Sequence, residues 1–211
     1  MNGPRLNVAR IHCVLFAFAL LIGGCVPFIK TQSASGLMLR EWVESQMFAP
    51  VILWPEPEGS KLWFPPRHID GPGYVELFYS EAFIGAGVEP PMYMLYESKS
   101  DLPVGQQLLT DYDVADTEVT ISNMNVVLCG KPVLIELRED SSIPDSGVAI
   151  FELDGTHVAY HWRHMSRATA LSTLEHNITQ VYEGDFDIIS SFDRMVENNF
   201  QRLRFSPTSV P

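Results

Sequence analysis

Short apolar runs dominate the middle of the chain, between Tyr74 and Trp162. Seven of these runs are rich in β-branched and aromatic residues, which favour strands, and turn-forming residues separate them. They span residues 75–79, 92–97, 117–121, 126–128, 133–137, 148–153 and 156–162. No long helical pattern lies between the runs, so their order predicts antiparallel pairing rather than a parallel sheet.

The sharpest turn signal is Asp154-Gly155, which connects the last two runs. A two-residue Asp-Gly loop favours the primed hairpin geometry, because both residues adopt positive φ values at low cost. In the run 133–137, Val133, Ile135 and Leu137 share one face, which indicates a strand with one solvent-facing side. We therefore expect a hairpin at the Asp-Gly turn, within a pair of antiparallel sheets.

Helical periodicity appears on both sides of this β-rich region. Residues 37–48 carry apolar side chains near helical spacing, and residues 171–181 also fit a helix, although their threonines permit a strand. Residues 185–204 give the clearest stripe, with acidic residues first and basic residues last, which complements the helix dipole. The sequence therefore predicts an α+β fold, with an antiparallel β-sandwich-like core and a C-terminal amphipathic helix packed on it.

The first 25 residues have the pattern of a targeting signal. Arg5 and Arg10 precede an apolar run of about 12 residues, whereas a helix needs roughly 20 to span a bilayer. A cleavable signal sequence therefore fits better than a permanent anchor. An ordinary secretory signal is one alternative, because Ala17 and Ala19 form a small-x-small pattern.

The apolar run ends in Ile22-Gly23-Gly24-Cys25. This sequence resembles the lipobox of bacterial lipoproteins, in which an aliphatic residue and two small residues precede the cysteine that becomes lipidated. The resemblance implies that residues 1–24 are a signal peptide and that a lipid on Cys25 anchors the chain to a membrane. It also implies the periplasmic face of the outer membrane, because Val26 replaces the aspartate associated with inner-membrane retention.

The remaining sequence is typical of a single folded domain with irregular ends. Residues 25–36 are largely small and polar and lack periodicity, which predicts a flexible tether. Residues 37–205 are numerous enough to bury a core as one β-rich globular domain. Residues 206–211 are expected to be a disordered tail.

Charge and cysteine content narrow the choice of partners. The chain has a formal net charge of −12 and its basic residues are scattered, so nucleic acid is not an expected partner. The predicted cleavage would remove Cys13 and the predicted lipid would occupy Cys25, so we expect Cys129 to have no partner for an internal disulfide. The apolar neighbours of Cys129 predict a small buried side chain rather than a reactive thiolate.

Three histidines, His157, His161 and His164, follow Asp154 within a short segment. Imidazole and carboxylate groups bind zinc, copper or nickel, so the segment is a candidate metal site. If the segment is a strand, however, His157 and His161 lie roughly 13 Å apart on one face, too far apart for one ion. The hairpin prediction therefore disfavours the metal hypothesis, and we expect no cofactor.

Aromatic residues in proline-rich loops form a second candidate site. Trp54, Trp63 and Phe64 are placed where exposure is easy, and such rings can stack on a glycan or a small ligand. The sequence contains no G-x-S-x-G, P-loop or dinucleotide-binding motif, so it does not indicate an enzyme.

These observations favour a lipid-anchored periplasmic protein that binds another protein or scaffolds an assembly of the cell envelope. A glycan-binding or small-ligand-binding lipoprotein is the main alternative, and a histidine-based metal protein is the third.

Overall fold

The computed structural model describes residues 37–45, 47–62, 66–68, 74–81, 90–99, 119–141 and 143–205. The predicted signal peptide, lipobox, tether and tail lie outside these residues. Within the described part of the chain, no helix is both long and apolar enough to cross a membrane.

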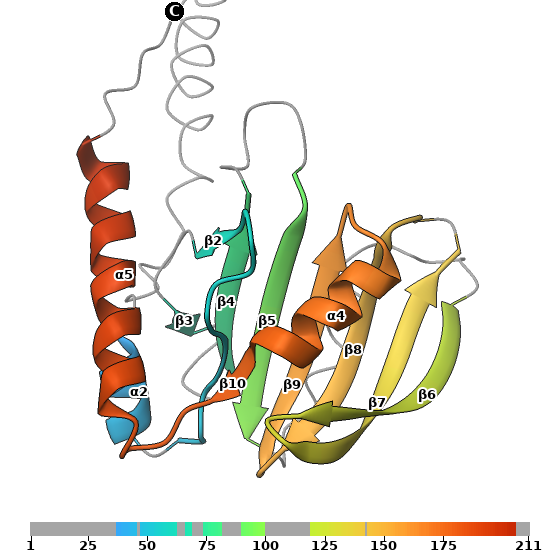
Figure 1. Ribbon diagram of the computed structural model, residues 1–211, viewed down its shortest axis with the longest axis horizontal. Coiled ribbons are helices and arrows are strands. Elements are labelled where there is room, and N and C mark those ends of the chain that lie inside the picture. The colour runs from blue at the N-terminus through green and yellow to red at the C-terminus, as the bar shows by residue number, and fades with distance from the viewer. Residues whose placement is uncertain are drawn as a thin grey trace, which may run out of the picture. The chain divides into compact units, whose positions relative to one another are not determined.

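Most strands belong to one antiparallel sheet in the order β2-β4-β5-β9-β8-β7-β6, with β3 also paired to β4 (Figure 1). Its strands are β2 (Lys61–Leu62), β3 (Arg67–His68), β4 (Tyr74–Ser80), β5 (Met92–Lys99), β6 (Val119–Leu128), β7 (Lys131–Asp140), β8 (Ser146–Leu153) and β9 (Thr156–Arg163). A second, two-stranded antiparallel sheet consists of β1 (Val51–Leu53) and β10 (Ile178–Gln180). The described helices are α2 (Leu39–Glu44), α4 (Arg167–Asn177) and α5 (Phe186–Phe205).

These elements confirm the predicted α+β class, the antiparallel core and the C-terminal helix packed on it. The helix expected within residues 37–48 is α2, whereas residues 171–181 divide between the end of α4 and the strand β10. The sequence predicts separate strands at 117–121 and 126–128, but the structure joins them in the ten-residue strand β6. Because β6 lies at the sheet edge, the polar residues between the two runs face solvent and the chain continues without a turn.

Two tight hairpins set the register of two strand pairs in the main sheet. Asp154 and Gly155 have φ values of 45° and 81°, which confirms the primed turn predicted between β8 and β9. Cys129 and Gly130 repeat this geometry between β6 and β7, with φ values of 51° and 76°. Both turns match the right-handed twist of their strands, so each hairpin register is fixed locally.

One face of the main sheet packs against α4, α5 and the small sheet, which together supply the second layer of the core. The largest fully buried side chains include Trp42, Tyr79, Tyr160, Trp162 and Phe192. The α5 contribution is Ile189, Phe192 and Val196, spaced as the predicted amphipathic stripe requires.

Helix α5 also holds the start of α2. The backbone N–H of Leu39 donates to Oδ1 of Asp193 over 2.7 Å, and the N–H of Arg40 approaches Oδ2 at 3.4 Å. The first N–H groups of a helix have no partner inside the helix, so this carboxylate satisfies two of them from a neighbouring element.

Side chains join the small sheet to the main sheet. The N–H of Leu53 donates to the hydroxyl of Tyr79 at 3.2 Å, and the amide of Gln180 donates to the carbonyl of Leu153 at 2.9 Å. Both hydrogen bonds are buried. Burial of these backbone groups without a partner would cost free energy, and the two bonds avoid that cost.

Candidate functional site

An open cleft of about 520 Å³ lies beside α4. Its walls come from the loop after β1, the end of β4 with the neighbouring strand β5, and one face of α4. The lining residues are Pro57, Glu58, Gly59, Glu81, Tyr93, Thr169, Ser172, Thr173, His176 and Asn177. Ligand pockets of roughly 300–1,000 Å³ are usual, so the cleft can hold a small molecule or one long side chain of a partner.

Helix α4 presents a polar stripe to this cleft. Thr169, Ser172, Thr173 and His176 follow the i, i+3, i+4, i+7 spacing that places side chains on one helix face. The adjacent face, which includes Leu174, is buried against the core, and α4 lies in front of the main sheet (Figure 1). The helix thus uses a narrow apolar face for packing and leaves hydroxyl and imidazole groups available to a ligand.

The imidazole of His176 has a defined orientation. Its Nδ1 lies 2.7 Å from the backbone oxygen of Ser172, and a carbonyl oxygen can only accept. Nδ1 therefore carries a proton, and in the neutral ring Nε2 is left as an acceptor. The Ser172 hydroxyl is 3.5 Å from the same Nδ1, which cannot take its proton, so the two residues are not arranged as nucleophile and base.

Several groups that line the cleft are held by contacts within the fold. The hydroxyl groups of Tyr93 and Thr173 are 3.2 Å apart and share a hydrogen bond. The Tyr93 ring also stacks on buried Tyr160, with 5.9 Å between centroids. The Asn177 amide donates to the carbonyl of Pro55 at 2.9 Å, which ties the end of α4 to the loop. These contacts hold the polar groups in place before any ligand arrives.

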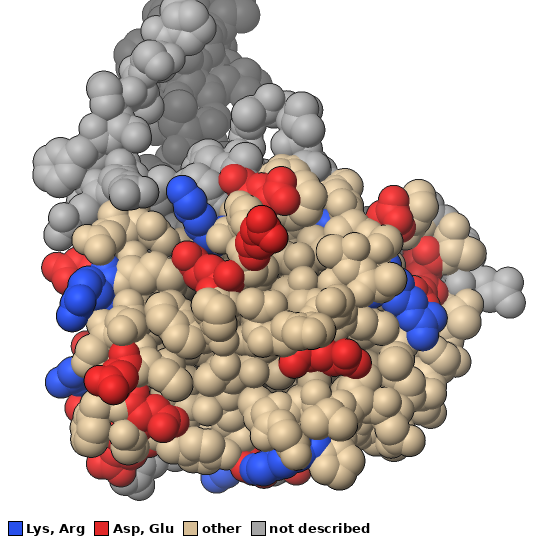
Figure 2. Space-filling view, in the orientation of Figure 1, with Lys and Arg blue, Asp and Glu red and all other residues tan. Residues whose placement is uncertain are grey.

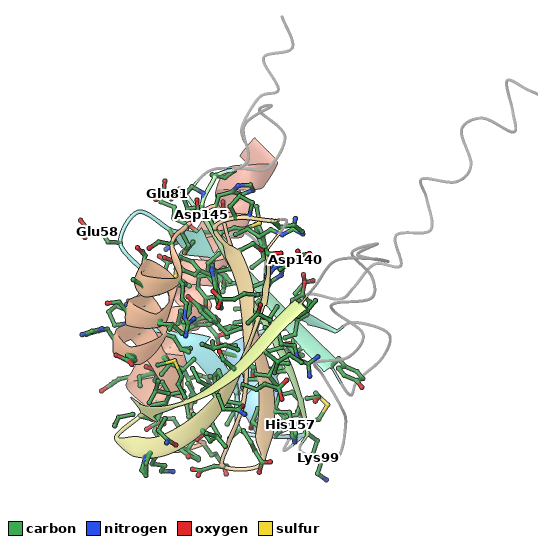
Figure 3. All side chains as sticks on the ribbon, turned by 90° about the vertical axis from the view of Figure 1, so that its right-hand side faces the viewer. Glu58, Glu81, Lys99, Asp140, Asp145 and His157 are labelled. Carbon is green, nitrogen blue, oxygen red and sulfur yellow. The ribbon has the colours of Figure 1, made fainter. Side chains whose placement is uncertain are left out.

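Two carboxylates line the cleft. Glu58 lies on the loop and Glu81 follows β4, and both project at the same end of the molecule (Figure 3). A Cβ atom at Gly59 would lie 3.3 Å from Oε1 of Glu81, so the carboxylate rests against the loop. No lysine or arginine is among the described residues that line the cleft. Figure 2 shows a group of acidic side chains in the upper part of this face, with a basic side chain beside it and further acidic side chains at the lower left.

The aromatic candidates are not brought together as a ligand platform. Trp54 is half-buried and meets Phe192 edge-on, with 6.2 Å between ring centroids, so it packs on the core instead of standing exposed. Trp63 and Phe64 lie outside the described residues.

The histidine candidates are spread along β9 and the residue after it. His157 is half-buried and its Nε2 lies 3.4 Å from a carboxylate oxygen of Glu152, whereas His164 is exposed with a φ of 58°. His161 is buried, and burial together with nearby Arg163 lowers its pKa to about 4. Among the described side chains, no group of three or more histidine, cysteine, aspartate or glutamate residues is placed to hold a metal ion.

The prediction that Cys129 is a buried side chain is wrong. Cys129 occupies the exposed hairpin turn after β6, and its thiol lies 3.5 Å from the carbonyl of Ile178, to which it donates. The partial burial of the sulfur raises its pKa and outweighs the lowering by the Gln180 backbone and Lys131. The thiol is therefore protonated at neutral pH and is not an activated nucleophile.

No protein family, curated protein or solved structure matches this chain. The cleft was not predicted from the sequence, because the periodicity of apolar residues indicates only the packing face of a helix. The signal that could have revealed it is the polar repeat Thr169, Ser172, Thr173 and His176, with the spacing of one helix face.

Proposed function

We propose that this protein is a lipid-anchored module of the cell envelope that binds a partner protein, with a basic side chain of the partner seated in the cleft beside α4. The observation that carries this proposal is the lining of the cleft, which combines Glu58 and Glu81 with neutral polar groups and no described lysine or arginine. A cationic ligand is the class that such a lining favours.

Arginine fits the lining better than lysine does. A guanidinium group can bind one carboxylate through two parallel hydrogen bonds, and its remaining N–H groups need further acceptors. Ser172, Thr173 and Nε2 of His176 supply acceptors along α4. The overall charge of −12 would also attract a basic partner from a distance and speed association.

The anchor places this binding site on the membrane surface. A lipid on Cys25 would hold residues 37–205 beside the envelope through the tether, so the protein would act as a local receptor for its partner. Mass spectrometry of the native protein should find Cys25 acylated. An unacylated Cys25 would remove the lipid anchor from the proposal.

Site-specific photo-crosslinking in the native host tests the binding site. A photoreactive amino acid at Ser172, inside the cleft, should give one covalent adduct with another protein. The same amino acid at Arg167 should not give it, because Arg167 is exposed on a different face of α4 and does not line the cleft.

Charge neutralisation tests the two cleft carboxylates. The double change Glu58→Gln and Glu81→Gln should abolish the adduct formed from Ser172. The matched control, Glu183→Gln with Glu197→Gln, makes an equal charge change at exposed sites and should preserve it.

Two results would overturn the proposal. An adduct that forms equally from both positions, or that survives neutralisation of the two cleft carboxylates, would place the partner elsewhere on the surface. Mass spectrometry of the adduct should identify an arginine or lysine near the crosslinked position of the partner.

A further inference from the structure

Among the described residues, the outer edge of the main sheet lacks the usual protection against strand pairing. Strand β6 ends the strand order and pairs only with β7 among the described strands. Its ten residues, VTISNMNVVL, contain no charged residue and no proline. Proteins normally guard long edge strands with lysine, proline or a bulge, so an edge without such protection indicates that another strand covers it.

The hairpin geometry tells which β6 residues offer their backbone to a new strand. In a two-residue hairpin the residues that flank the turn, here Leu128 and Lys131, form a hydrogen-bonded pair. Backbone groups alternate in direction along a strand, so the N–H and C=O groups of Ile121, Asn123 and Val127 point away from β7. Those of Asn125 point the same way. The side chains at these four positions are also exposed on one face of the sheet.

Pro132 supports this assignment. It lies opposite Val127, in a pair that is not hydrogen-bonded across β6 and β7, so its missing N–H costs no bond in the ladder. The outward groups of Val127 are therefore available at the edge of the sheet.

The edge is self-complementary. Its exposed positions mirror each other about Met124, with an apolar residue at each end, Ile121 and Val127, and an asparagine on either side of the centre, Asn123 and Asn125. If two copies align antiparallel with Met124 opposite Met124, Asn123 meets Asn125 and Ile121 meets Val127. Each of those pairs joins residues whose backbone groups point outward, so the register forms hydrogen-bonded pairs along the edge.

We propose that two copies of this chain associate through their β6 edges, antiparallel and centred on Met124, to form one continuous sheet across a two-fold axis. A two-fold interface uses the same surface on both copies, which requires the self-complementarity that this strand has. A strand from an unrelated partner would need no such symmetry. This dimer goes beyond the proposed cleft function, because the cleft beside α4 is lined by other residues.

Electrostatics permit the association although each copy carries a net charge of −12. The contacting strand is uncharged, and the nearest charges on the same face of β7 are paired, because Arg138 donates to Glu136. The exposed side chains of Ile121 and Val127, with 59% and 61% of their surface accessible, would cover each other across the axis.

Light scattering of the mature lipidated protein in detergent tests the dimer. The expected result is a protein mass of two chains, reduced to one chain by Asn125→Lys, because a lysine on the edge resists strand pairing. The matched control is Leu134→Lys. Leu134 lies on the same face with 62% of its surface accessible, but on β7, and the variant should stay dimeric.

Disulfide trapping tests the register. In a Cys129→Ser background, Met124→Cys should form a disulfide-linked dimer on mild oxidation, because the residue faces its own copy at the axis. Thr120→Cys, exposed on the same strand, should not form one, since its copy lies many residues away along the pair. Three results would overturn the proposal. They are a wild-type mass of one chain, loss of the dimer in both lysine variants, and equal disulfide trapping by both cysteine variants.

Discussion

The buried carboxylate of Glu97 accepts a hydrogen bond from the backbone N–H of Val51, with 2.9 Å between Oε2 and the nitrogen. Glu97 lies on β5 of the main sheet and is fully buried, so this bond attaches β1 of the small sheet to the core. Burial raises the pKa of Glu97 well above its ordinary value of 4.5, and the N–H of Val51 lowers it only in part. The folded protein therefore favours the protonated acid, while the unfolded chain does not.

Replacement of Glu97 by glutamine should remove a pH-dependent loss of stability. Because the folded pKa is raised, the stabilisation from protonated Glu97 is fully present below about pH 4.5 and is lost as pH rises through the folded pKa. The free energy of unfolding of Glu97→Gln minus that of the wild type should therefore rise above pH 4.5. This difference in the free energy of unfolding should rise by at most about 1.4 kcal/mol per pH unit, until the pH reaches the folded pKa of Glu97.

Urea unfolding at several pH values between 4 and 8, compared with Glu175→Gln on the exposed face of α4, measures this difference. A difference between Glu97→Gln and the wild type that does not change with pH would mean that Glu97 stays ionised in the fold. Glu97→Ala should be destabilised at every pH, by about 1–3 kcal/mol or more, because it leaves the buried N–H of Val51 without an acceptor.

Glycine is the only residue that position 147 in β8 accepts without a shift of its neighbours. Gly147 lies opposite Trp162 of β9, and a Cβ atom there would come within 2.3 Å of Cζ2 of the indole. Gly147→Ala should therefore displace the Trp162 ring from its fully buried site and cost roughly 1–3 kcal/mol of unfolding free energy. Thermal unfolding and the tryptophan emission maximum should both change.

Gly184→Ala is the matched control for Gly147. A Cβ atom at Gly184 has no neighbour within 4 Å, so this change should be neutral or raise stability by up to about 1 kcal/mol through the unfolded state. Equal effects of the two substitutions would show that the cost at Gly147 comes from backbone freedom and not from the indole.

The parts of the fold that local chemistry decides could be predicted from the sequence. The Asp154-Gly155 turn follows from two residues that tolerate positive φ, and the α5 stripe follows from residues three and four apart. The order of strands in the sheet depends on contacts between distant segments, and no local pattern encodes it. For the same reason β6 appeared as two strands, because its polar centre resembles a turn until its place at the edge is known.

The candidate site depends on the same long-range information. Glu58, Glu81 and Thr173 are ordinary polar residues in sequence, and only the packing of α4 brings them to one cleft. Likewise, Glu97 ends an apolar run and could have been a solvent-facing residue. Its burial follows from the small sheet, whose strands β1 and β10 are 127 residues apart between the paired positions Ile52 and Thr179.

Replacement of Cys129 by asparagine should stabilise the hairpin turn after β6. Residues other than glycine, asparagine and aspartate are strained in the left-handed region of backbone conformation, and Cys129 lies there with a φ of 51°. Cys129→Asn should therefore raise the free energy of unfolding by roughly 1 kcal/mol. Cys129→Ala keeps the strain and loses the thiol contact with Ile178, so chemical denaturation should show no gain for it. A gain of equal size for both variants would assign the effect to removal of the thiol.

The attachment of α2 to α5 should depend on the carboxylate of Asp193. Asp193→Ala leaves the N–H groups of Leu39 and Arg40 without their partner, which should cost about 1–2 kcal/mol, the usual effect of losing a helix cap. Trypsin reports the change locally, because it cuts after Arg40 only when the start of α2 is released. Cleavage at Arg40 should be fastest in Asp193→Ala and intermediate in Asp193→Asn, whose side chain keeps one acceptor oxygen. Equal cleavage rates in all three proteins would mean that apolar packing of Leu39 and Trp42 holds α2 without this carboxylate.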